Sequence, residues 1–89
     1  MIMLWTDGNG HWTNNVRTAR DGNYYNPSAR ELYDYIDEET DKVQSWDAVD
    51  DDAYDQLAYY CGLDIGDYDS RDDLMDDCLV EIEKEEKGR

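Results

Sequence analysis

Apolar residues recur at intervals of three and four along much of the chain, a spacing that predicts amphipathic helices. The first predicted helix covers about 26–39, because Asn26 suits an N-cap and Pro27 suits the first helical position. Its apolar face comprises Ala29, Leu32, Tyr33 and Ile36.

Two further helices are predicted in the C-terminal half of the chain. One covers about 46–61 and stops at Gly62, a natural left-handed C-cap, with Leu63 placed to make the accompanying apolar contact. The other begins at Ser70, with Asp73 as an acidic capping-box partner, and passes into a frayed tail, EKEEKGR. Their predicted core-facing residues are Trp46, Val49, Ala53, Leu57 and Tyr60 in the former and Leu74, Met75, Cys78, Leu79 and Ile82 in the latter.

Residues 2–25 show the pattern of strands and turns instead. Segments 2–6 and 11–13 flank the sequence DGNG, whose Asp-Gly and Asn-Gly pairs favour tight hairpin turns. Segments 16–19 and 23–25 are predicted to be short and extended as well. The whole pattern predicts one α+β domain, residues 1–89, in which an N-terminal β-hairpin or small antiparallel sheet is followed by three helices.

The composition limits the core and its chemistry. With 89 residues and no Phe, the core must draw on eight Tyr and three Trp, and we expect Trp5 and Trp12 to face each other across the hairpin. Cys61 and Cys78 fall at apolar helix positions, which favours free thiols and leaves open whether they ever pair. No segment approaches the ~20 apolar residues of a membrane span, so we expect a cytoplasmic protein that does not enter membranes.

Charge is the most unusual property of the sequence. The net charge is −16, which disfavours nucleic acid as a direct ligand and predicts a basic partner. Residues 43–83 contain fourteen acidic side chains and a single basic one, Arg71, and therefore carry −13 of this charge. We expect Arg71 to pair with its neighbours Asp69 or Asp72. Three tyrosines adjoin the acidic segments and are candidate interface anchors: Tyr59, Tyr60 and Tyr68.

The acidic residues are also ordered. Asp73, Asp77, Glu81 and Glu85 recur every four residues on the third predicted helix, and Asp47, Asp51 and Asp55 do so on the second. Four residues rise about 6 Å along an α-helix, and neighbouring phosphates on one DNA strand lie roughly 7 Å apart once the winding is included. A row of carboxylates on a helix can therefore approximate a row of phosphates.

In size, charge and tyrosines among acidic residues, the chain resembles the small acidic DNA mimics of phages and mobile elements. These are the anti-CRISPR proteins and the antirestriction proteins of the Ocr and ArdA type, which share no common motif. The resemblance implies a stoichiometric inhibitor that occupies the nucleic-acid-binding site of a CRISPR effector or a restriction enzyme. The resemblance assigns no individual residue. The acidic segments themselves predict the partner-binding residues, which are Asp47, Asp50, Asp51, Asp52, Asp55, Asp69, Asp72, Asp73, Asp76, Asp77 and Glu81.

Other functions would also be compatible with this charge. An acidic antitoxin or a modulator of another basic protein is the main alternative, and a merely solvated face or adaptation to high salt would also give acidic helices. The Asp-rich segments do not fit a calcium loop, since a loop starting at Asp67 would place Arg71 and Asp72 at its fifth and sixth positions. With His11 as the single histidine and no phosphate-binding Gly-rich loop, we expect no enzyme, no catalytic residue, no metal site and no cofactor.

Overall fold

The computed structural model describes residues 3–88. It confirms an α+β fold, with a two-stranded antiparallel sheet at the N-terminus followed by helices. Ile2, at the start of the predicted first strand, lies outside the described residues. In chain order the elements are β1 (Trp5–Thr6), β2 (Trp12–Thr13), α1 (Val16–Asp21), α2 (Ala29–Val43), the 3-10 turn η1 (Trp46–Ala48), α3 (Asp51–Cys61), the 3-10 turn η2 (Ile65–Asp67) and α4 (Arg71–Lys87).

The hairpin forms where the sequence predicts it. The loop between the strands uses positive φ at Gly8 (81°) and Gly10 (93°), and Asp7 Oδ1 accepts hydrogen bonds from the backbone amides of Asn9 and His11. The two tryptophans do not face each other, however: Trp5 pairs with Thr13, and Thr6 pairs with Trp12. Successive residues of a strand point to opposite faces, so this register separates the two indoles.

Residues 16–19 are helical, and the prediction of an extended segment there is wrong. They belong to α1, whose N-cap Asn15 accepts a hydrogen bond from the Thr18 amide through its side chain. Only Ala19 of this short helix is buried, so no apolar periodicity marks it in the sequence. Of residues 23–25, Tyr25 forms an isolated antiparallel bridge with Thr6.

The first long helix, α2, begins later and ends later than predicted. Its N-cap is Ser28, which forms a complete capping box with Glu31, rather than Asn26. The helix continues to Val43 and ends at Gln44, which has a left-handed backbone.

The second predicted helix is interrupted near its start. Trp46–Ala48 form the turn η1, Val49 is extended, and α3 begins only after Asp50. The predicted stop at Gly62 is confirmed, since its φ is 73° and the Leu63 amide bonds to the Ala58 carbonyl 2.8 Å away.

The α4 N-cap is Ser70, as predicted, but only half of the capping box forms. Ser70 Oγ accepts from the Asp73 amide, and the helix extends through most of the tail that was predicted to fray. Among the described bonds Asp73 makes no return bond to Ser70, because its side chain is one methylene shorter than that of Glu.

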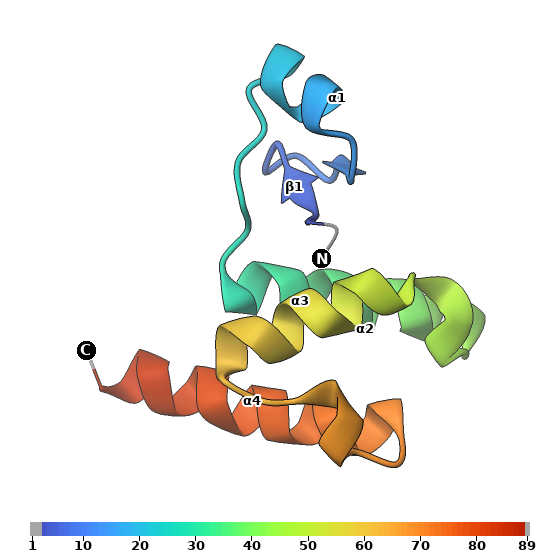
Figure 1. Cartoon of the computed structure of the whole chain (residues 1–89), viewed down its shortest axis with the longest axis vertical. Helices are drawn as coiled ribbons and strands as arrows, with labels where there is room; N and C mark the ends of the chain where they lie inside the picture. The colour runs from blue at the N-terminus through green and yellow to red at the C-terminus, as the bar shows by residue number, and fades with distance from the viewer. Residues whose placement is uncertain (1–2, 89) are drawn as a thin grey trace.

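The core lies between α2, α3 and α4, which all contact one another (Figure 1). Leu32, Ile36, Leu57, Leu74 and Cys78 are completely buried, whereas Tyr60 is half-buried and packs against this core. Leu79 is only half-buried and Trp46 is exposed at the surface, contrary to prediction. Tyr54, which the periodicity did not select, is completely buried. Cys61 and Cys78 are free thiols, as expected.

The hairpin and α1 lie to one side of this helical layer (Figure 1). Side chains connect the hairpin to the helices. The buried Gln56 of α3 accepts from the Leu4 amide at 2.7 Å and donates to the Leu4 carbonyl at 3.3 Å. Trp12 stacks on Tyr35 of α2 with ring centroids 4.3 Å apart. On α4, the side chains of Asp72, Asp73, Asp76 and Asp77 are exposed to solvent.

Candidate acidic interface

The acidic row on α4 lies on one continuous helix. Asp73 and Asp77 are exposed and Glu81 is half-buried, and Asp72 and Asp76 add two more exposed carboxylates beside the row. Because all of these residues share one α-helix, successive members of the row are separated by about 6 Å along its axis. The structure therefore brings together the charges that the spacing predicted on this helix.

The predicted row on the second helix is broken. Asp47 belongs to η1, whereas Asp51 and Asp55 belong to α3, and the extended residue Val49 separates the two elements. Asp50 is the N-cap residue of α3, and Asp52 is half-buried in its first turn. These residues form an acidic helix start, where carboxylates interact favourably with the helix dipole, and not a regular ladder of charge.

Arg71 makes a different ion pair from the one expected. Its guanidinium lies 2.9 Å from Asp51 Oδ1 on α3 and 5.1 Å from the centre of the buried Tyr54 ring. The expected pairing with Asp69 or Asp72 is therefore wrong: the side chain reaches across to α3 instead of to its sequence neighbours. This contact joins the first turns of α3 and α4 and offsets one of the acidic charges.

Two members of the acidic row on α4, Asp77 and Glu81, have polar partners. The Tyr68 hydroxyl donates to Asp77 Oδ2 at 2.8 Å, and this hydrogen bond raises the pKa of Tyr68 to about 12. Lys84 Nζ lies 3.3 Å from Glu81 Oε1. The C-terminal part of the row is thus partly neutralised, and its strongest negative charge lies at Asp73 and Asp77.

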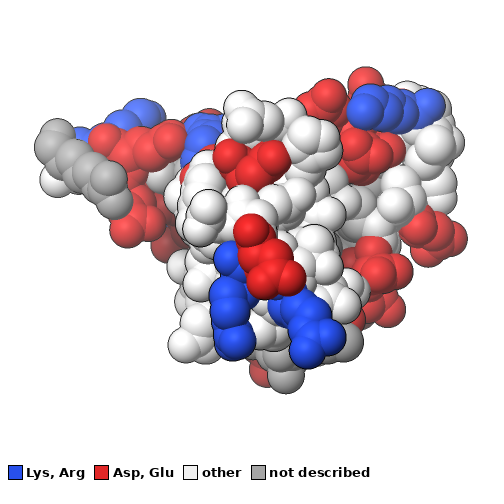
Figure 2. All heavy atoms as spheres, turned by 90° about the horizontal axis from the view of Figure 1, so that it is seen from above, with Lys and Arg blue, Asp and Glu red and all other residues white. Residues whose placement is uncertain are grey.

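Of the four Lys and Arg side chains with described ion pairs, Arg71 and Lys84 contact this surface and the other two lie outside it. Arg30 pairs with Glu86 at 2.8 Å, and Lys42 pairs with Glu39 at 3.2 Å. Seen from the end that carries α1, basic and acidic groups lie next to one another and are surrounded by uncharged surface (Figure 2). The excess negative charge is therefore unevenly distributed over the molecule.

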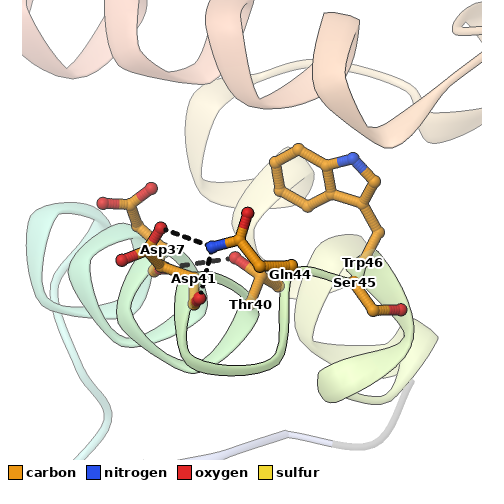
Figure 3. A pocket seen from close by; sticks show the side chains of 6 residues that line it. All are labelled: Asp37, Thr40, Asp41, Gln44, Ser45 and Trp46. Atoms are coloured by element: carbon orange, nitrogen blue, oxygen red, sulfur yellow. Dashed lines mark hydrogen bonds between the residues drawn. The ribbon is translucent and has the colours of Figure 1, made fainter.

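A separate pocket of about 240 Å³ lies where α2 passes into η1 (Figure 3). The Gln44 side-chain amide in this pocket donates to both the backbone carbonyl and the carboxylate of Asp41. Some polar groups that line the pocket are therefore already hydrogen-bonded to one another. The full lining is Asp37, Thr40, Asp41, Gln44, Ser45 and Trp46. None of these residues belongs to the predicted interface.

The residues described by the structure contain no cluster of three or more potential metal ligands. No helix within residues 3–88 is both long and apolar enough to cross a membrane. Comparison with family models, curated proteins and solved structures gave no match.

Proposed function

We propose that the protein is a stoichiometric inhibitor that imitates DNA and blocks the nucleic-acid-binding site of a host defence complex. The leading form of this proposal is an anti-CRISPR protein that binds a CRISPR effector, and a restriction enzyme is the second class of target. The protein acts without catalysis, by presenting carboxylates to basic side chains that would otherwise hold phosphates.

The observation that carries this proposal is the acidic row on α4. Asp73, Asp77 and Glu81 lie four residues apart on a helix of 17 residues. The exposed members of the row face solvent and do not contribute to the core. Repulsion between like charges at this spacing costs a helix a few tenths of a kcal/mol per pair, and binding to a basic groove would offset that cost.

An acidic antitoxin is the second candidate function, because a basic toxin would recognise the same charges. The broken arrangement of Asp47, Asp51 and Asp55 supports this alternative, since irregular carboxylates suit a folded basic protein as well as a DNA groove. The two functions differ in what the partner loses on binding. A DNA mimic removes the ability of its partner to hold DNA, whereas an antitoxin blocks a toxic activity.

A competition gel-shift assay tests the proposal. The partner, isolated by pull-down from a host lysate, is mixed with labelled DNA and rising amounts of the protein. We expect the partner–DNA band to disappear near one equivalent of inhibitor, with no shift of DNA by the inhibitor alone. A stable ternary complex of partner, DNA and this protein would contradict the proposal.

A further inference from the structure

A second hollow, of about 380 Å³, lies beside the C-terminal half of α3, next to the acidic surface. It is formed by α3 on one side and by the chain that leaves α3 on the other. Its lining combines apolar groups with two carboxylates and comprises Asp55, Ala58, Tyr59, Leu63, Asp64 and Ile65.

The turn after α3 builds this hollow. Gly62 takes a left-handed backbone, and the Leu63 amide then bonds back to the Ala58 carbonyl at 2.8 Å. Asp64 follows as the N-cap of η2 and accepts from the Gly66 amide at 2.9 Å. One carboxylate oxygen of Asp64 is used in this way, which fixes the side chain at the edge of the hollow.

Tyr59 is the most unusual residue of the lining. It is 68% exposed, the most exposed of the large hydrophobic side chains within residues 3–88, and its ring is tilted against that of Tyr60 with centroids 6.3 Å apart. The exposed Tyr59 ring shares this lining with the half-buried Leu63 and Ile65, and tyrosine is enriched among the residues that dominate interface energies.

We propose that this hollow receives an arginine side chain of the basic partner, an inference that rests on the proposed function. The methylene groups of arginine would pack on the half-buried Leu63 and Ile65, and the guanidinium would lie against the Tyr59 ring and pair with a carboxylate. Arginine fits better than lysine because its planar cation both stacks on aromatic rings and forms paired hydrogen bonds with carboxylates. The nearby carboxylates, Asp55 and Asp64, supply the charge complementarity.

The test is an NMR titration of the full chain with acetyl-arginine-N-methylamide, alongside the lysine analogue and the uncharged citrulline analogue. We expect the arginine compound to shift the backbone amides of Tyr59 and 63–65 most, the lysine analogue to bind more weakly and citrulline to give no shift. Tyr59→Ala should weaken binding about two- to fivefold, the effect of losing an exposed cation–π contact. Tyr59→Phe should retain the affinity of the unmodified chain.

Asp55→Asn should also weaken binding, whereas Asp37→Asn, which removes an exposed carboxylate on α2, should not. Shifts spread evenly over the acidic helices, or arginine binding that is unchanged in both Tyr59→Ala and Asp55→Asn, would overturn the proposal. A negative titration combined with successful displacement of DNA from the partner would reject the arginine site alone. A positive titration without displacement of DNA would reject DNA mimicry and leave the hollow as a site for another basic protein.

Discussion

Gln56 is a completely buried amide on a helix face that otherwise contributes to the core. Besides its two bonds to Leu4 it donates to the Tyr60 hydroxyl at 2.9 Å, so one side chain connects the hairpin to α3. Apolar periodicity could not identify this role, because the partner backbone lies 52 residues away in the chain. A buried polar residue needs such partners to offset the loss of its hydration.

We expect Gln56→Ala to lower the free energy of unfolding by about 1–3 kcal/mol, because it leaves the Leu4 amide without its acceptor. Urea unfolding followed by circular dichroism measures this change. Tyr60→Phe, which removes only the bond between the two side chains, should cost less. Equal stability of Gln56→Ala and the unmodified chain would show that this amide does not hold the hairpin.

Tyr54 makes the stability of the fold depend on pH in the alkaline range. Its hydroxyl donates to the Trp46 carbonyl at 2.7 Å, and burial raises its pKa from 10.0 to about 12. Between these pH values the unfolded chain loses the phenol proton while the folded chain keeps it. The stability present below pH 10 therefore decreases as pH rises, by up to about 1.4 kcal/mol per pH unit from this group.

Tyr54→Phe should remove this contribution, so its stability should fall less steeply between pH 10 and pH 12 than that of the unmodified chain. The measurement is a series of urea unfolding curves across this range. At neutral pH the variant should be less stable, because the Trp46 carbonyl loses its donor. Parallel slopes for the two proteins would mean that the Tyr54 pKa is the same in the folded and unfolded states.

At the scale of elements, periodicity and caps predicted α4, the end of α3 and most of α2. The sequence did not reveal α1, which is short and buries only Ala19, or the break before α3, because Val49 keeps helical spacing while its backbone is extended. The sequence reveals the acidic segments as a run of charge. It does not reveal the partners of these carboxylates, because the bonds from Arg71 to Asp51 and from Tyr68 to Asp77 depend on how the loops bring the elements together.

The start of α3 offers a test of which carboxylates stabilise the fold. From the sequence alone we expect both Asp51→Asn and Asp55→Asn to relieve repulsion and leave stability unchanged or higher. The structure changes this expectation for Asp51, which lies in the first helical turn and pairs with Arg71. Asp51→Asn should therefore lower stability by up to about 1 kcal/mol, while Asp55→Asn should not. Thermal melts in which Asp55→Asn is the less stable variant would contradict a stabilising role for the Asp51 carboxylate.

At the scale of the whole molecule, the net charge of −16 attracts any basic partner, and salt screens that attraction beyond about 8 Å at physiological ionic strength. Total charge alone cannot distinguish a DNA mimic from a nonspecific polyanion. The distinction depends on whether the position of the charges affects inhibition. Because the row on α4 is continuous, it can be removed in one variant and compared with a second variant that loses the same charge elsewhere.

The most direct measurement compares two triple variants in an inhibition assay on the isolated partner. The first, Asp73→Asn, Asp77→Asn and Glu81→Gln, removes the row. The second, Asp21→Asn, Asp37→Asn and Glu38→Gln, removes the same charge from α1 and α2, and it leaves the capping residue Glu31 in place. The Ser70 cap is kept in both, since it bonds the backbone amide of Asp73.

Circular dichroism first establishes that both variants are folded. DNA mimicry by α4 predicts that the first variant loses most of its inhibition while the second stays close to the unmodified protein, because the nonspecific field is reduced equally in both. Equal inhibition constants for the two folded variants would contradict the account and reduce the protein to a general polyanion.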